Sequence, residues 1–184
     1  MFHECNDVSR YVRRFTGETW GRRVSNMPVS ALAVANAFLA LARRDGKRLT
    51  NMKLQKLVYI AHGWSLALLG RPLFYNGVNA WQWGPVIPQL YEALKKYGAG
   101  VVSEPVPTDE EVDPYSQEMA IIREVWKSYG HLSAMQLSGI THKTGTPWYE
   151  TWNTERYNLI PNTRIARHYR DLLNEQRTSG QRGV

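Results

Sequence analysis

The chain of 184 residues is 43% hydrophobic and 21% charged, a composition that excludes an intrinsically disordered protein and favours one globular domain. Its single cysteine, Cys5, excludes an internal disulfide, and no apolar run is long enough to span a bilayer, so we expect a cytoplasmic protein without a membrane partner. The net charge of +7 can attract nucleic acid, but the excess lies mostly toward the chain ends, so we interpret it as solvated helix faces and tails.

The first predicted segment is an N-terminal extension, residues 1–26, which holds five arginines and three acidic residues. Within it, Val8, Tyr11 and Phe15 lie on one face at helical spacing, which predicts a short amphipathic basic helix. We expect the folded domain to begin at residue 27.

The strongest helical signals follow. Ser30 is the predicted N-cap of a helix that ends at Asp45-Gly46, and Thr50 is the predicted N-cap of a second helix that ends at Gly70. The apolar residues at helical spacing are Ala31, Val34, Ala35, Phe38 and Ala42 in the first helix, and Leu54, Leu57, Val58, Ala61, Trp64 and Leu68 in the second. These two segments are predicted to form an antiparallel pair.

Residues 73–83 carry the signal of a small β-hairpin. Asn76-Gly77 favours a type I′ turn, and strand alternation would place Trp81 and Trp83 on one face. Gly84-Pro85 is interpreted as a turn that ends the second strand. Because an isolated hairpin is barely stable in water, we expect the tryptophan face to pack on the helices.

The remaining elements are predicted to be helical. Their expected starts are Pro88, Asp113-Pro114, Ser133 (with capping-box spacing to Gln136), Thr146-Pro147 and about Thr163. The acidic stretch 103–113 is predicted to be a solvated linker, and residues 176–184 a polar tail. We therefore predict a mainly α fold, a compact single-domain bundle of about six helices with one small β-hairpin, spanning residues 27–175.

The sequence contains no recognisable catalytic motif. The five histidines lack metal-binding spacing and have no second cysteine beside them, so no metal site is predicted. There is no nucleophile elbow and no glycine-rich phosphate loop. We expect a protein without a cofactor that is not an enzyme; a hydrolase using His142 is the weaker hypothesis.

A cluster of basic residues surrounds the connection between the first two helices. It consists of Arg43, Arg44, Lys47, Arg48, Lys53 and Lys56. Such a cluster could contact phosphates, which makes a DNA-binding regulator the alternative function. We do not favour this alternative, because the helix after Thr50 turns Leu57 and Ala61 inward and resembles a core helix more than a recognition helix.

Three separated blocks resemble a known family. The sequence TNMKLQKLVY at 50–59 resembles the T-N-x-K-L-Q-K-L-x-Y signature of the Panacea domain, which occurs in SocA-like antitoxins and many phage-associated proteins. The likeness continues through AHGW and GRPLF, then AWQWGPVIP at 80–88, and finally LSGITH and GTPW within 137–148. It covers the chain from about Pro28 to Leu173.

The resemblance implies a mainly helical antitoxin of a type II toxin–antitoxin system. Such a protein neutralises a co-encoded toxin by binding it, and some relatives instead hand the toxin to a ClpXP-type protease as proteolytic adaptors. The expected partners are therefore a cognate toxin and, as a further option, that protease. The family pairs with toxins of unrelated kinds, so the resemblance does not identify the toxin.

We interpret the family motif residues mainly as structural. They are Lys53, Leu54, Gln55, Lys56, Trp81, Gly84, Pro85, Thr141, His142, Pro147 and Trp148. Partner choice would then depend on other surfaces. The first candidates for toxin contact are Val8, Tyr11 and Phe15 on the predicted N-terminal helix. This helix could equally dock on its own domain. The exposed hairpin edge and the acidic stretch, which would suit a basic toxin, are further candidates.

Overall fold

The structure is a computed structural model that describes residues 27–181. This part of the chain contains seven α-helices, one short 3-10 helix and a two-stranded antiparallel sheet, which confirms the predicted mainly α fold with one small hairpin. None of its helices combines the length and hydropathy needed to cross a membrane. The candidate contact residues Val8, Tyr11 and Phe15 lie outside the described residues.

The first two helices begin where their N-caps predict. The Ser30 side chain accepts a hydrogen bond from the backbone of Ala33 at the start of α2 (Ala31–Arg44). The Thr50 side chain does the same for Lys53 at the start of α3 (Asn51–Leu68). Both caps satisfy an otherwise unpaired amide of the first helical turn, and they are visible in sequence because they are local.

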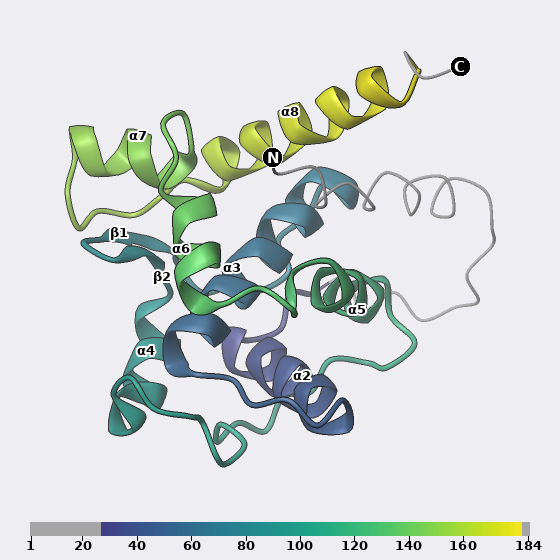
Figure 1. Cartoon of the computed structure of the whole chain (residues 1–184), viewed down its shortest axis with the longest axis vertical. Helices are drawn as coiled ribbons and strands as arrows, with labels where there is room; N and C mark the ends of the chain where they lie inside the picture. The colour runs from purple at the N-terminus through teal and green to yellow at the C-terminus, as the bar shows by residue number, and fades with distance from the viewer. Residues whose placement is uncertain (1–26, 182–184) are drawn as a thin grey trace.

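Helix α3 is the centre of the fold. Figure 1 shows it surrounded by α2, α5 (Gln117–Tyr129), α6 (Ala134–Thr141) and α8 (Asn162–Gln181), and it packs against each of these helices. It is buried on all sides for most of its length, which is typical of a central helix.

The hairpin lies later in the chain than predicted. Strands β1 (Asn79–Trp81) and β2 (Gly84–Val86) pair with Trp81 opposite Gly84, so Gln82 and Trp83 form the turn. The predicted turn at Asn76-Gly77 is therefore wrong, as is the interpretation of Gly84-Pro85 as a strand end. Trp83 is 69% exposed in the turn and does not share a packed face with Trp81.

Long-range contacts explain this difference. The Asn76 side chain accepts a hydrogen bond from the backbone of Ala31, at 2.7 Å, and Phe74 forms a bridge with Val29. The segment before the hairpin is thus held at the start of α2. Asn76-Gly77 has neither of the positive φ angles that a type I′ turn requires.

The acidic stretch is not a solvated linker. Within residues 103–113, Val106 is buried, and the Asn36 side chain exchanges two hydrogen bonds with the backbone of Val106, at 2.7 and 2.8 Å. The Glu110 carboxylate accepts a hydrogen bond from the backbone of Ser30. The stretch lies along α2 because its apolar residues can be buried there while most of its acids stay at the surface.

The later helices follow the predicted order with shifted ends. Their bounds are α4 (Pro88–Leu94), the 3-10 helix η1 (Lys95–Tyr97), and α7 (Pro147–Thr154). Helix α5 starts after an N-cap at Ser116 and not at Asp113-Pro114, because the Ser116 hydroxyl accepts from the backbone of Met119. Helix α8 continues to Gln181 and so includes residues predicted to belong to the polar tail.

Candidate functional site

A lysine of the family motif is buried beneath the hairpin. Lys56 on α3 is 1% exposed, and its Nζ donates hydrogen bonds to the carbonyls of Trp83 and Pro85, at 2.8 and 3.1 Å. Among the described residues no carboxylate pairs with it. Burial lowers its pKa from the ordinary value to about 7, because the charged form is poorly solvated there.

The glycine that faces this lysine has two reasons to lack a side chain. Gly84 has a φ of +106°, which L side chains rarely adopt. A Cβ there would also lie 2.4 Å from Nζ of Lys56 and 2.8 Å from the His142 ring. The close approach of strand β2 to both side chains therefore depends on this glycine.

Two aromatic residues from α7 and the end of α6 also contact the hairpin. The Trp148 Nε1 on α7 donates to the carbonyl of Trp81, at 2.8 Å. The His142 ring lies 4.0 Å from the Trp148 ring, and its Nδ1 is 2.6 Å from the carbonyl of Ser138. Burial lowers the pKa of His142. Lys56, Gly84, His142 and Trp148, which we call the hairpin clasp, thus fix the turn to three helices.

The other polar residues of the first motif block also bind backbone. Gln55 exchanges two hydrogen bonds with the backbone of Ile87, at 3.1 and 3.3 Å, as a neighbouring strand would. Lys53 Nζ donates to the carbonyl of Gly130 just after α5, at 2.8 Å. Asn51, which lies in the same block, donates to the carbonyls at the ends of α4 and η1. Leu54 is fully buried among these contacts.

The last motif block forms the connection between α6 and α7. The Thr146 hydroxyl caps α7 and donates to the carbonyl of Thr141, at 2.9 Å, and Pro147 occupies the first turn of α7. The Thr141 hydroxyl donates to Ser138 one turn earlier. All three blocks thus converge on the hairpin and its neighbours.

This arrangement offers little for catalysis. The described residues contain no group of three or more side chains that could hold a metal ion. The hairpin clasp contains a buried amine and an imidazole whose Nδ1 is bonded to backbone, with no carboxylate beside them. The contacts of the hairpin clasp hold the hairpin against the helices, which is a structural role.

The basic cluster is divided by the fold. Lys56 points into the protein, the half-buried Lys53 donates to the Gly130 carbonyl, and Arg44 forms an ion pair with Asp45, at 2.8 Å. The Arg44 hydrogen bond lowers the pKa of Asp45, which also accepts from Trp126 Nε1. Only part of the sequence cluster therefore remains available at the surface.

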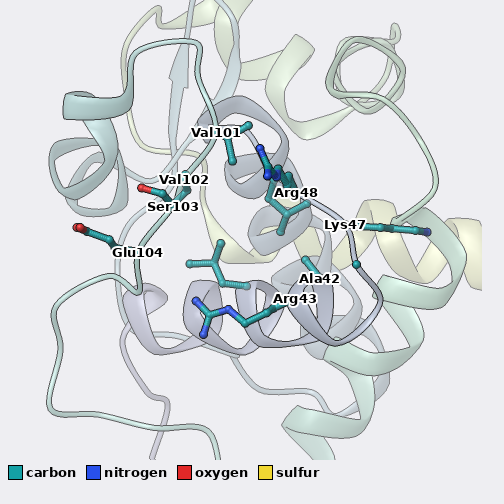
Figure 2. Close-up of a pocket in the computed structure, with 11 residues that line it drawn as sticks. Ala42, Arg43, Lys47, Arg48, Val101, Val102, Ser103 and Glu104 are labelled. Atoms are coloured by element: carbon teal, nitrogen blue, oxygen red, sulfur yellow. The ribbon is translucent and has the colours of Figure 1, made fainter.

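The remaining basic residues border a groove of about 510 Å³ (Figure 2). It lies between the C-terminal part of α2, residues 46–49 and residues 101–104. Arg43 and Arg48 flank it from opposite sides, whereas Lys47 extends away from it and lies over the Trp126 ring. We call it the basic groove. Sequence analysis identified its cations, but its other wall comes from a segment more than fifty residues later.

Comparisons with known proteins agree with the sequence blocks. The family described as Antitoxin SocA-like, Panacea domain, matches residues 54–149. Antitoxin SocA of Caulobacter vibrioides (strain NA1000 / CB15N) is 34% identical over 154 residues, covering 75% of this chain and 78% of that protein. No solved structure matches significantly.

Proposed function

Because the chain belongs to the family of SocA-like antitoxins with a Panacea domain, we propose that it neutralises a co-encoded toxin by direct protein–protein binding in the cytoplasm. The observation that carries this proposal is the 34% identity to a protein named antitoxin over three quarters of the chain. The inward direction of the motif side chains supports a binding protein over an enzyme, because their hydrogen-bonding capacity is used within the fold.

The test is co-expression with the product of the neighbouring reading frame. We expect that product to stop growth alone, and growth to resume when this chain is produced with it. The two proteins should also co-purify in a fixed ratio. A toxic neighbour that this chain neither rescues nor binds would contradict the proposal.

A second part of the proposal concerns the fate of the toxin. Following the resemblance, we propose that this chain can deliver its toxin to a ClpXP-type protease. The toxin's half-life after translation is stopped should then be shorter with this chain present, and only in cells that contain ClpX. A half-life independent of ClpX, with growth still rescued, would leave neutralisation by binding alone.

The N-terminal extension remains a proposed contact surface. Replacing Val8, Tyr11 and Phe15 with alanine should weaken toxin binding by about tenfold or more if they anchor the interface. Met135→Ala on α6 is a matched control, since this side chain is 73% exposed and apolar. Equal toxin affinity of both variants would remove the extension from the interface.

DNA binding is the alternative function, and the fold weakens its basis. Two of the six cations in the basic cluster are engaged inside the protein, and a third is paired with Asp45. Binding to the protein's own promoter should be measured between 50 and 200 mM salt. A specific complex with a steep salt dependence would support this alternative.

A further inference from the structure

We propose that the basic groove binds an acidic, amphipathic peptide segment of the protein partner, in which carboxylates alternate with apolar side chains. The inference rests on the proposed function insofar as that partner is the toxin. It is carried by the combination of apolar lining residues, two arginines without a side-chain partner among the described residues, and a size that suits a short chain segment.

The floor of the groove is apolar and its walls are held in place. The apolar lining residues are Leu39, Ala42, Leu49, Val101 and Val102. The backbone of Val102 donates to the carbonyl of Leu49, at 2.9 Å, and Thr50 forms a bridge with Val101. The wall formed by residues 101–104 is thus paired to the chain that leads into α3, so the groove is already formed without a ligand.

The two flanking arginines lack internal partners. Arg43 and Arg48 are exposed, and no side chain among the described residues forms an ion pair or hydrogen bond with either guanidinium. Glu104, which also lines the groove, already binds Lys96 at 3.2 Å. The groove therefore carries positive charge that residues 27–181 do not neutralise.

An acidic amphipathic segment matches both properties. Guanidinium groups bind carboxylates through two parallel hydrogen bonds, and these strengthen where apolar surface excludes water. Apolar side chains of the segment would cover Val101, which is 39% exposed, and the half-buried Leu39, whereas the other apolar lining residues are already buried. A volume of about 510 Å³ accommodates a few residues of an extended chain.

A nucleic-acid backbone fits the same groove less well. It would need a track of cations spaced along successive phosphates, whereas this groove offers two arginines around an apolar floor. Lys47, the third cation near the groove, is directed away over the Trp126 ring and so does not extend such a track. The observations therefore favour a peptide.

The decisive variant is Arg43→Glu with Arg48→Glu in the full chain. Its matched control is Lys143→Glu with Arg170→Glu, which applies the same change of charge to exposed residues elsewhere. Affinity for the neighbouring-frame product is measured by calorimetry, after melting curves show that both variants fold. We expect at least about a tenfold loss for the groove variant and little change for the control. Equal losses, or none, would overturn the proposal.

A second probe separates this inference from the proposed function. It is a synthetic eight-residue peptide that alternates glutamate and leucine, with a glutamine–leucine peptide as its uncharged counterpart. We expect the wild-type chain to bind the acidic peptide more tightly than the uncharged one, and the groove variant to lose this preference. Peptide binding without toxin binding would contradict the toxin proposal alone. Toxin binding without a preference for the acidic peptide would contradict the groove proposal alone.

Nucleic acid provides the third outcome of the test. Duplex DNA could bind the wild-type chain but not the groove variant, while the acidic peptide binds neither. This result would mean that the groove binds the phosphate backbone of DNA, and it would overturn the peptide proposal. Absence of DNA binding, together with the peptide preference, supports the proposal.

Discussion

Lys56 holds the hairpin turn through two hydrogen bonds, although burial removes most of the hydration of its ammonium group. An uncompensated buried ammonium is unfavourable, and two carbonyl dipoles replace only part of its hydration. The benefit is that a hairpin with strands of three residues each, too short to be stable alone, is fixed to the central helix.

This burial predicts a stability that depends on pH. The unfolded lysine titrates near 10.5 and the folded one near 7, so between these values the unfolded chain binds more protons. The free energy of unfolding should therefore rise from pH 7 to 9.5, with Lys56 contributing up to about 1.4 kcal/mol per pH unit. Tyr59 and Tyr169 have raised pKa values and act in the opposite direction only near pH 10 and above.

The measurement is urea unfolding at pH 7, 8 and 9, with Lys56→Met as the control. The variant should lose most of the rise, although the lowered pKa of Lys53 leaves a smaller dependence of the same sign. An identical slope in both proteins would show that Lys56 does not titrate in this window.

Gly84→Ala should be strongly destabilising. The new Cβ combines an unfavourable positive φ with contacts to Lys56 and His142 that are too short. We expect a loss of about 2–4 kcal/mol in the free energy of unfolding. Gly145→Ala, at a φ of +82° and with nothing within 4 Å of the new Cβ, has a φ penalty without the contacts and serves as the control. If both cost the same, the contacts with the hairpin clasp do not contribute.

At the scale of elements, α3 contacts more of the other helices than any other element does. Its polar side chains bind the hairpin and the ends of α4 and α5, and its apolar and aromatic residues pack against the neighbouring helices. The contact with α8 is the closest, because Gly63 admits the ring of Tyr169. Trp64 also meets that ring edge to face, at 5.2 Å.

Gly63→Ala should separate α8 from α3. A Cβ at this position would lie 2.2 Å from the Tyr169 ring, so one helix must move. We expect a loss of about 2–3 kcal/mol in unfolding free energy, and faster hydrogen exchange in α8 than in α2. Adding Tyr169→Leu should recover part of the loss, and a strictly additive double variant would contradict this account.

At the scale of the whole molecule, the positive charge bears on the proposed binding of an acidic partner. The chain carries a net charge of +7, and the basic groove concentrates part of it at a surface where no described side chain pairs with Arg43 or Arg48. Charge of this kind accelerates encounter with an acidic partner more than it prolongs the complex.

Toxin association should therefore depend on salt. We expect the association rate constant to fall several-fold between 50 and 500 mM sodium chloride, with a smaller change in the dissociation rate constant. Stopped-flow measurement on the wild-type chain and the Arg43→Glu/Arg48→Glu variant provides the check. A salt dependence that is unchanged in the variant would place the attraction elsewhere on the molecule.

The limits of prediction follow from the range of each interaction. The N-caps of α2, α3, α6 and α7 join residues three positions apart, so their sequence neighbourhood is sufficient to identify them. The predicted hairpin turn at Asn76-Gly77 is wrong because the Asn76 side chain accepts a hydrogen bond from the backbone of Ala31, forty-five residues earlier. The prediction of a solvated linker at 103–113 is wrong because Val106 is buried and its backbone is hydrogen-bonded to Asn36 on α2.

The sequence by itself therefore determined the mainly α fold, the starts of most helices and the family, because local hydrogen bonds, apolar periodicity and ordered motif blocks can be read along the chain. Only the tertiary structure decided the register of the hairpin, the internal use of Lys53 and Lys56, and the basic groove. The Lys56–Trp83 contact spans 27 positions and the Asn36–Val106 contact 70. Such pairings depend on how helices pack around α3, which no single segment encodes.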